Sequence, residues 1–366
     1  MRLAFRLLGL VILGLVLWFG VDLGALGRRL GAADLRLVGA ALALLGPMIF
    51  AKTLRWQGLT RVGGKGYAPA RAFVVFLVGL YAGSVTPGRL GELLRASYLV
   101  RDGAATPGVA LASVVGDRLF DLYALLVVAA GGVAWFGLAG RLSLAGLAAL
   151  ATAALSPAAL ASPRLMGWVG DRFARRRASA AAASAASAAP RGRFARLVDA
   201  ALGGADAGTF AREFAATLRA QVALAPAARA LALTALGYGL FFVQCWWLFR
   251  AVGVPFGFVD VAFTMSLVNL VSLLPVTFAG IGTRDAALVA LFGLRGLGGD
   301  AALAASAAVL LVFYVTVAVA GFVAWQLAPL PAGPAAPGAL LPNRSEEIRV
   351  GEQRADGAAE QQAGSQ

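Results

Sequence analysis

Residues 76–99 read FLVGLYAGSVTPGRLGELLRASYL, and this stretch decides how the rest of the chain is interpreted. It begins as an apolar membrane helix, breaks at Ser84-Val85-Thr86-Pro87-Gly88, and resumes with charged residues. A helix broken at Pro-Gly leaves backbone N–H and C=O groups that hydrocarbon cannot satisfy. Such a break is tolerated where the segment is buried in protein or lines a watered cavity. The stretch therefore predicts a helical hairpin inside a membrane protein.

A second interrupted helix lies downstream, where residues 272–285 read SLLPVTFAGIGTRD. Both stretches follow one order: an apolar helix, then Ser, Pro and Gly, then Arg and an acid. Paired broken helices in the two halves of a membrane chain point to a transport site. The residues predicted to form the breaks are Thr86, Pro87, Gly88 and Gly91 in the first stretch, and Pro275, Gly280 and Gly282 in the second.

The composition is that of a polytopic, all-α membrane protein. The chain has 366 residues, of which 60% are hydrophobic, and its mean hydropathy is +0.79. The net charge of +14 indicates cytoplasmic loops and contact with anionic lipid headgroups. Nucleic acid is a poor alternative, because no folded soluble domain is available to present a basic face. The chain has no histidine and a single cysteine, Cys245, which excludes His-based catalysis, His metal sites and an internal disulfide.

The distribution of charge predicts the topology. Residues 52–71 carry Lys and Arg without any acid, and the loop 162–226 is also strongly basic, so both are expected in the cytoplasm. If residues 72–86 crossed the membrane completely, that loop would lie outside. We therefore expect 72–100 to be a re-entrant hairpin from the cytoplasmic face, and 257–298 to be a second one from the outer face.

This topology gives about six transmembrane helices, two re-entrant hairpins and two cytoplasmic termini. The units 35–137 and 227–327 then have opposite orientations, which is the inverted repeat typical of alternating access. Residues 1–328 form the transmembrane domain, and the polar tail 329–366 is expected to be disordered. The predicted spans are 3–21, 35–51, 107–137, 142–161, 227–249 and 301–327. Arg-rich, Ala- and Gly-heavy usage suggests the inner (cytoplasmic) membrane of a bacterium with a GC-rich genome.

The basic loop itself has two parts. The Ala- and Ser-rich stretch 174–190 is expected to be a flexible linker near anionic headgroups. Residues 205–225 repeat apolar side chains at helical spacing and predict an amphipathic helix lying on the membrane surface.

Three charged side chains follow the first break. Arg89, Glu92 and Arg95 are spaced i, i+3 and i+6, so the two arginines fall on a broad common helical face. Two guanidinium groups and one carboxylate leave one net positive charge, which suits a phosphate or phosphodiester bound by bidentate Arg contacts. The alternative is that this half of the hairpin lies at the interface with its charges solvated.

A second charged group, Asp117, Arg118 and Asp121, begins the apolar run GDRLFDLYALLVV. The two aspartates share a helical face and could pair with Arg89 or Arg95, which would pin the hairpin to the next span. The two aspartates could therefore serve as a structural brace or contact the substrate. The alternative is a helix-start cluster at the cytoplasmic surface. No further ligand set accompanies the carboxylates, so no metal site and no cofactor are expected.

Arg284 and Asp285 follow Gly280 and Gly282 in the second break. The glycines allow close backbone approach and leave N–H groups free, which favours an anion. The alternative is an internal Arg–Asp pair that caps a short helix. Outside these groups, Asn269 predicts a hydrogen bond between helices, and Trp56 predicts an interfacial anchor.

The segments TPGRLGELLRASYL, VVGDRLFDLYALL and LLPVTFAGIGTRDAAL, in this order, resemble the membrane region of the lysylphosphatidylglycerol synthase family. The resemblance covers roughly residues 5–327. The family usually has Glu-Arg where this chain has Asp117-Arg118, and often Glu where it has Arg284-Asp285. The resemblance implies a lipid-translocating domain. In bifunctional members a separate soluble domain makes the aminoacyl lipid from aminoacyl-tRNA. Because the tail after residue 327 is short, synthase activity is not expected.

The sequence therefore favours a flippase-like transporter, not an enzyme, for a lipid with an anionic headgroup. Candidate lipids are a phospholipid, an aminoacyl-phosphatidylglycerol and a polyprenyl-phosphate-linked sugar. The competing functions are a membrane-embedded glycosyl or lipid transferase, for which no base and no Asp-x-Asp motif is found, and a non-transporting accessory of an envelope-synthesis complex. A homo-oligomer or an envelope-synthesis partner remains open. The predicted substrate contacts are Arg89, Glu92, Arg95, Asp117, Arg118, Asp121, Arg284 and Asp285.

Overall fold

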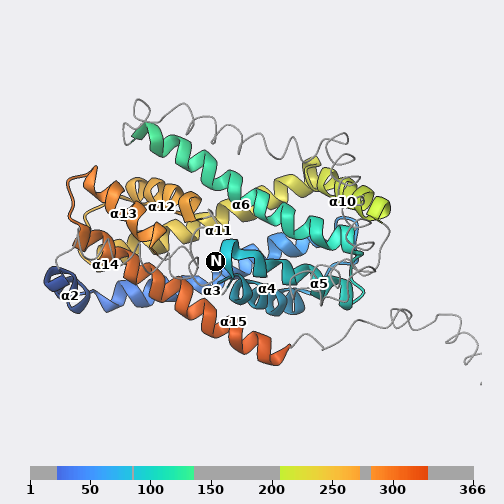
Figure 1. The fold of residues 1–366 in the computed structure, drawn as a ribbon, viewed down its shortest axis with the longest axis horizontal. Coiled ribbons are helices and arrows are strands. Elements are labelled where there is room, and N and C mark those ends of the chain that lie inside the picture. The colour runs from blue at the N-terminus through green and yellow to red at the C-terminus, as the bar shows by residue number, and fades with distance from the viewer. Residues whose placement is uncertain (1–22, 85, 136–206, 273–281, 329–366) are drawn as a thin grey trace, which may run out of the picture.

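The computed structural model describes residues 23–84, 86–135, 207–272 and 282–328, and the structural statements below concern these residues (Figure 1). Within them every regular element is a helix, which confirms the predicted all-helical class. The predicted spans 3–21 and 142–161, the linker 174–190 and the tail 329–366 lie outside the described residues.

Two groups of helices precede and follow the undescribed residues 136–206. The first group comprises α2 (Leu23–Gly31), α3 (Leu35–Thr60), α4 (Pro69–Ser84), the 3-10 helix η1 (Pro87–Leu93), α5 (Leu94–Arg101) and α6 (Pro107–Trp135). The second comprises α10 (Ala207–Gln221), α11 (Leu224–Ala251), α12 (Phe258–Ser272), α13 (Thr283–Gly293), α14 (Gly299–Val309), the π-helix η2 (Leu310–Val315) and α15 (Thr316–Leu327).

Three of the described helical segments are long and apolar enough to cross a membrane: Leu35–Thr60, Leu224–Ala251 and Gly299–Leu327. Helix α6 has 29 residues and is also largely apolar, but it carries three charged side chains in its first half. These lengths exceed the roughly 20 residues that a bilayer core requires. The chain is therefore an integral membrane protein.

The long helices pack in a reciprocal pattern. Helix α3 lies along α11, while α6 packs against α12 and α15 packs against α4 (Figure 1). The last long helix of each group thus contacts the first arm of the hairpin in the other group. Two apolar cores result, one centred on α11, α12 and α14, and one on α3, α4 and α5.

The first hairpin consists of α4 as one arm and η1 with α5 as the returning arm. The chain reverses at Thr86, whose hydroxyl donates to the Ala82 carbonyl and accepts from the Gly91 amide. A Cβ at Gly91 would collide with the Ala82 carbonyl, so the close approach of the two arms requires glycine there. Gly83 faces the Glu92 side chain in the same way.

The two ends of this hairpin are fastened to each other. Arg71, near the start of α4, pairs with Asp102 just after α5 at 2.9 Å. The Tyr67 hydroxyl also donates to Asp102, at 2.8 Å. Burial, together with that hydrogen bond, raises the pKa of Tyr67, so the phenol remains a donor. The hairpin therefore leaves and returns at the same level of the molecule.

The second hairpin, α12 with α13, is closed in the same way. Asp260 at the start of α12 pairs with Arg295 just after α13 at 2.8 Å. The indole of Trp135 donates to the same carboxylate. Of the predicted break, Gly282 precedes α13 with a positive φ of 87°, whereas Pro275 and Gly280 lie outside the described residues.

The structure corrects the predicted end of the second span and shows which helix the predicted amphipathic helix packs against. Helix α3 continues to Thr60, so Lys52 and Arg55 lie within it and not in a cytoplasmic loop. Trp56 is fully buried and is not an interfacial anchor. The physical reason is that acids from α6 neutralise the two basic residues, which lets α3 stay inside the protein. Helix α10 forms as predicted and packs against α6.

Candidate functional site

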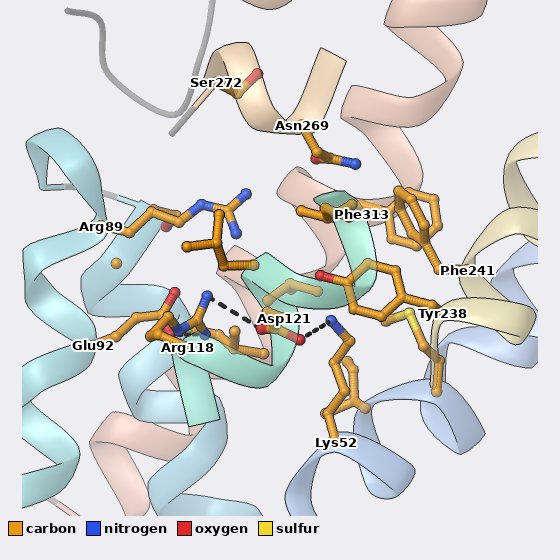
Figure 2. Close-up of a pocket in the computed structure, with 18 of the residues that line it drawn as sticks. Lys52, Arg89, Glu92, Arg118, Asp121, Tyr238, Phe241, Asn269, Ser272 and Phe313 are labelled. Atoms are coloured by element: carbon orange, nitrogen blue, oxygen red, sulfur yellow. Dashed lines mark hydrogen bonds and ion pairs between the residues drawn. The ribbon is translucent and has the colours of Figure 1, made fainter. Parts of the chain in front are cut away.

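A cavity of about 420 Å³ lies between the two hairpins and the helices α3, α6, α11 and η2 (Figure 2). Most of its lining is apolar, with Phe76, Leu122 and Phe313 among the contributors. Its polar lining residues are Lys52, Ser84, Arg89, Glu92, Arg118, Asp121, Tyr238, Asn269, Ser272, Arg284 and Tyr314. An apolar cavity with a few convergent polar groups is the usual form of a small-molecule site.

Asp117 forms the centre of a buried ion network behind the cavity wall. Its carboxylate lies 2.8 Å from the Arg55 guanidinium on α3 and 3.0 Å from that of Arg95 on α5. All three side chains are at most 1% exposed. Buried charges persist only when they are paired and hydrogen-bonded. The pairing therefore joins α3, α5 and α6 at one point, as expected for a brace to Arg95, and the alternative of a helix-start cluster at the surface is wrong.

Asp121, one turn further along α6, collects three cations. It lies 2.8 Å from Arg55, 3.4 Å from Lys52 and 3.5 Å from Arg118. Figure 2 shows the last two contacts as dashed lines. The Lys52 ammonium also sits 4.3 Å from the centroid of the Tyr238 ring. Asp121 thus holds the basic groups of α3 and α6 against the cavity.

Glu92 on the first hairpin pairs with two arginines. Its carboxylate is 3.2 Å from Arg95 and makes a close ion pair with Arg118 of α6. Glu92 is almost fully buried. The returning arm of the hairpin is therefore tied to α6 twice, through Glu92–Arg118 and through Arg95–Asp117.

Arg89 differs from every other basic residue of this network. It has a left-handed backbone with φ 55°, which is uncommon for a residue other than glycine and costs about 1–3 kcal/mol. Its guanidinium donates to the Tyr314 hydroxyl at 3.2 Å. No carboxylate among the described residues lies within ion-pair distance of it. Arg89 therefore points a cation without a counter-ion into the cavity, as Figure 2 shows.

Arg284, on the second hairpin, approaches the same tyrosine. Its guanidinium carbon lies 5.1 Å from the centroid of the Tyr314 ring, and that of Arg89 lies 6.0 Å from it. Nε of Arg284 donates to Ser306 at 3.1 Å, and Nη2 contacts Asp285 at 3.5 Å. Its Nη1 is buried and has no hydrogen-bond partner in the described part of the chain. One arginine from each hairpin thus meets at Tyr314.

The π-helix η2 carries Tyr314 and the neighbouring Phe313 into the cavity. Short π segments inside α-helices occur frequently at functional sites. The Tyr314 ring faces an arginine from each of the two hairpins.

Five of the predicted site residues line the cavity, and three do not. The lining residues are Arg89, Glu92, Arg118, Asp121 and Arg284. Arg95 and Asp117 lie behind the wall as a brace. Asp285 accepts the Gly282 amide at 2.9 Å and a close hydrogen bond from Ser306, which is the helix-capping alternative. The prediction of a common face for Arg89 and Arg95 is wrong, because Arg89 reaches Tyr314 while Arg95 reaches α6.

Several functional residues were missed or misassigned from the sequence. Lys52 and Arg55 are spaced i, i+3, and the two aspartates of α6 are spaced i, i+4, so each pair lies on one face of its helix. These matching basic and acidic faces were the signal that could have predicted the contact. Tyr314 and Tyr238 carry no local signal in an apolar run. Asn269 was predicted to bond another helix, but its amide donates to the Met265 carbonyl of its own helix at 2.8 Å and lines the cavity.

The long apolar helices and the paired hairpins define an integral membrane protein with a charged cavity among its helices. The family profile described as "Lysylphosphatidylglycerol synthase TM region" matches residues 6–321. The chain therefore belongs to this family, whose membrane proteins are tied to lipid modification or flipping, and the predicted resemblance is confirmed. A search of curated proteins found no match to the chain.

Proposed function

We propose that the chain is a flippase-like transporter that moves a lipid with an anionic headgroup between leaflets without changing it covalently. The headgroup occupies the cavity between the hairpins while the acyl chains stay in the surrounding lipid. The observation that carries this proposal is the convergence of Arg89 and Arg284, one from each hairpin, on an otherwise apolar cavity.

The electrostatics of the lining support an anionic ligand. Among the described lining residues, Lys52, Arg89, Arg118 and Arg284 are basic, and only Glu92 and Asp121 are acidic. A cation in a low-dielectric site is costly unless an opposite charge compensates it. A phosphate of a phospholipid, an aminoacyl-phosphatidylglycerol or a polyprenyl-phosphate-linked sugar would supply that charge.

We further propose that both hairpins are re-entrant and that the two groups of helices form an inverted repeat in the bacterial inner membrane, with cytoplasmic termini. Two features support this. The last long helix of each group packs on the hairpin of the other group, α6 on α12 and α15 on α4. An Arg–Asp pair also closes the base of each hairpin. In an inverted repeat the bases of the two hairpins face opposite sides of the membrane.

Cysteine labelling tests this topology. Because Cys245 is the sole cysteine of the chain, a Cys245→Ala background allows single probes. In intact cells, Lys65→Cys beside the first base should react only from the cytoplasm, and Leu294→Cys beside the second base only from outside. Labelling of both cysteines from the same side would contradict the inverted repeat.

Reconstitution tests transport itself. Purified protein in liposomes should move fluorescent phosphatidylglycerol, aminoacyl-phosphatidylglycerol or a polyprenyl-phosphate sugar to the opposite leaflet, with the lipid mass unchanged afterwards. A new covalent product would favour the transferase. Absence of movement for all three lipids, with co-purification of an envelope synthase, would favour the accessory role.

A further inference from the structure

We propose that Arg89, Arg284 and Tyr314 form one seat for a phosphodiester or phosphate-ester group, which both hairpins hold at the same time. This inference rests on the proposed function, since it names the ligand chemistry and the contact residues of the same cavity. It also assigns a role to Tyr314, whose hydroxyl faces the ligand.

The geometry places both guanidinium groups against one ring. The guanidinium carbon of Arg89 lies 6.0 Å from the Tyr314 centroid, and that of Arg284 lies 5.1 Å from it. The distance between the two carbons therefore cannot exceed the sum of these two distances. Both arginines and the tyrosine line the cavity. The left-handed backbone of Arg89 brings its side chain to this point, and such backbone outliers cluster at ligand sites.

The pairing of charges singles out these two arginines. Arg55 and Arg95 each contact two carboxylates, and Arg118 contacts Glu92 and Asp121. Arg284, by contrast, contacts one carboxylate among the described residues, that of Asp285 at 3.5 Å, and Arg284 is only 3% exposed. Its Nη1 donor is buried without a partner among the described residues, and buried donors are nearly always satisfied. Arg89 has no carboxylate partner among the described residues, so its guanidinium and this donor can both donate to a ligand's anionic oxygen.

The chemistry of the donors favours phosphate over carboxylate. A carboxylate can bridge two arginines, as Asp117 does, but its two oxygens lie in one plane. A tetrahedral phosphate group presents oxygens in several directions and can accept from two guanidinium groups and a phenol. Arg is the preferred residue for such bidentate phosphate contacts. The bound group therefore bridges the hairpins, and losing either arginine removes most of the benefit of the other.

A binding assay on the full chain in detergent tests the seat separately from transport. The probes are fluorescent phosphatidylglycerol and the same label on an uncharged diacylglycerol and on a fatty acid. Phosphatidylglycerol should bind about tenfold or more tightly than either. Arg89→Ala and Arg284→Ala should each weaken its binding about tenfold to a hundredfold. The double variant should be little weaker than the weaker single one, because a bridging ligand couples the two sites.

The controls separate charge, shape and folding. Arg212→Ala, at an exposed arginine of α10, should bind as the unmodified chain does. Arg89→Lys and Arg284→Lys should restore binding only partly, since an ammonium lacks the planar fork. Tyr314→Phe should weaken binding about threefold to tenfold by removing one hydroxyl. If Arg284→Ala folds poorly, the binding of Arg284→Lys is compared with that of the unmodified chain instead.

Each outcome decides a different claim. Equal binding of the fatty acid would overturn the preference for phosphate, and additive losses in the double variant would overturn the shared seat. Inorganic phosphate that displaces the lipid at equal concentration would assign the seat to free phosphate and overturn the lipid as its ligand. Selective, coupled binding without lipid movement would support the seat and contradict transport.

Discussion

The two hairpins have the same outline but different attachments. Each is closed at its base by an Arg–Asp pair at the surface. The returning arm of the first is fixed to α3 and α6 by buried ion pairs through Asp117 and Glu92. The second carries its Arg284–Asp285 pair against Ser306 of α14, within its own group of helices. The difference shows that charges beside a helix break serve two purposes: one set holds a hairpin in place, and another faces the cavity.

The separation of these purposes is clearest within the first hairpin. Arg95 is neutralised by Glu92 and Asp117 and stacks on the Trp56 and Phe76 rings. Arg89, six residues earlier, donates to the Tyr314 hydroxyl and pairs with no carboxylate in the described part of the chain. The first is a structural residue, and the second is available to a ligand.

The largest effect is expected for Asp117→Ala. It leaves the Arg55 and Arg95 guanidinium groups buried beside an emptied position, and breaking a buried pair costs about 3–5 kcal/mol. The amount of folded protein recovered in detergent should fall sharply. Asp102→Asn, at the exposed hairpin base, is the matched control and should change recovery little. Normal recovery of Asp117→Ala would show that the first hairpin does not depend on this brace.

A smaller effect is expected for Gly91→Ala. The added methyl group would meet the Ala82 carbonyl, so the returning arm must shift away from α4. Overpacking of this kind costs about 1–3 kcal/mol. Gly39→Ala is the control, because a Cβ at Gly39 meets nothing within 4 Å and alanine favours a helix. Thermal unfolding in detergent should separate the two, and equal midpoints would contradict the close packing of the arms.

The smallest effect is expected at the bases. Arg71→Ala and Arg295→Ala each remove an exposed pair, and such pairs contribute about 0–1 kcal/mol. Both variants should keep nearly normal thermal midpoints and nearly equal ones. A large loss in only one of them would mean that the two bases are not equivalent and would weaken the inverted repeat.

The sequence was sufficient to predict the helical class, the helix break at Pro87 and the family, because Pro87 and Gly88 interrupt an apolar run. It was not sufficient to assign each charge. Asp117 meets Arg55 across 62 residues of chain, and no local pattern reports such a distant partner. The role of Arg89 depends on a left-handed backbone, and that of Tyr314 on a π segment. Neither conformation has a signal in the surrounding apolar residues.

The central claim is that Arg89 faces the lipid headgroup while Arg95 only supports the fold. The most direct test measures lipid movement in liposomes by Arg89→Ala, Arg89→Lys and Arg212→Ala, each at equal amounts of folded protein. We expect Arg89→Ala to fold normally, because it breaks no ion pair among the described residues, and to lose at least about tenfold in rate, as one charge-assisted contact implies. Arg89→Lys should retain part of the rate, and Arg212→Ala all of it. Full lipid movement by folded Arg89→Ala would contradict the account.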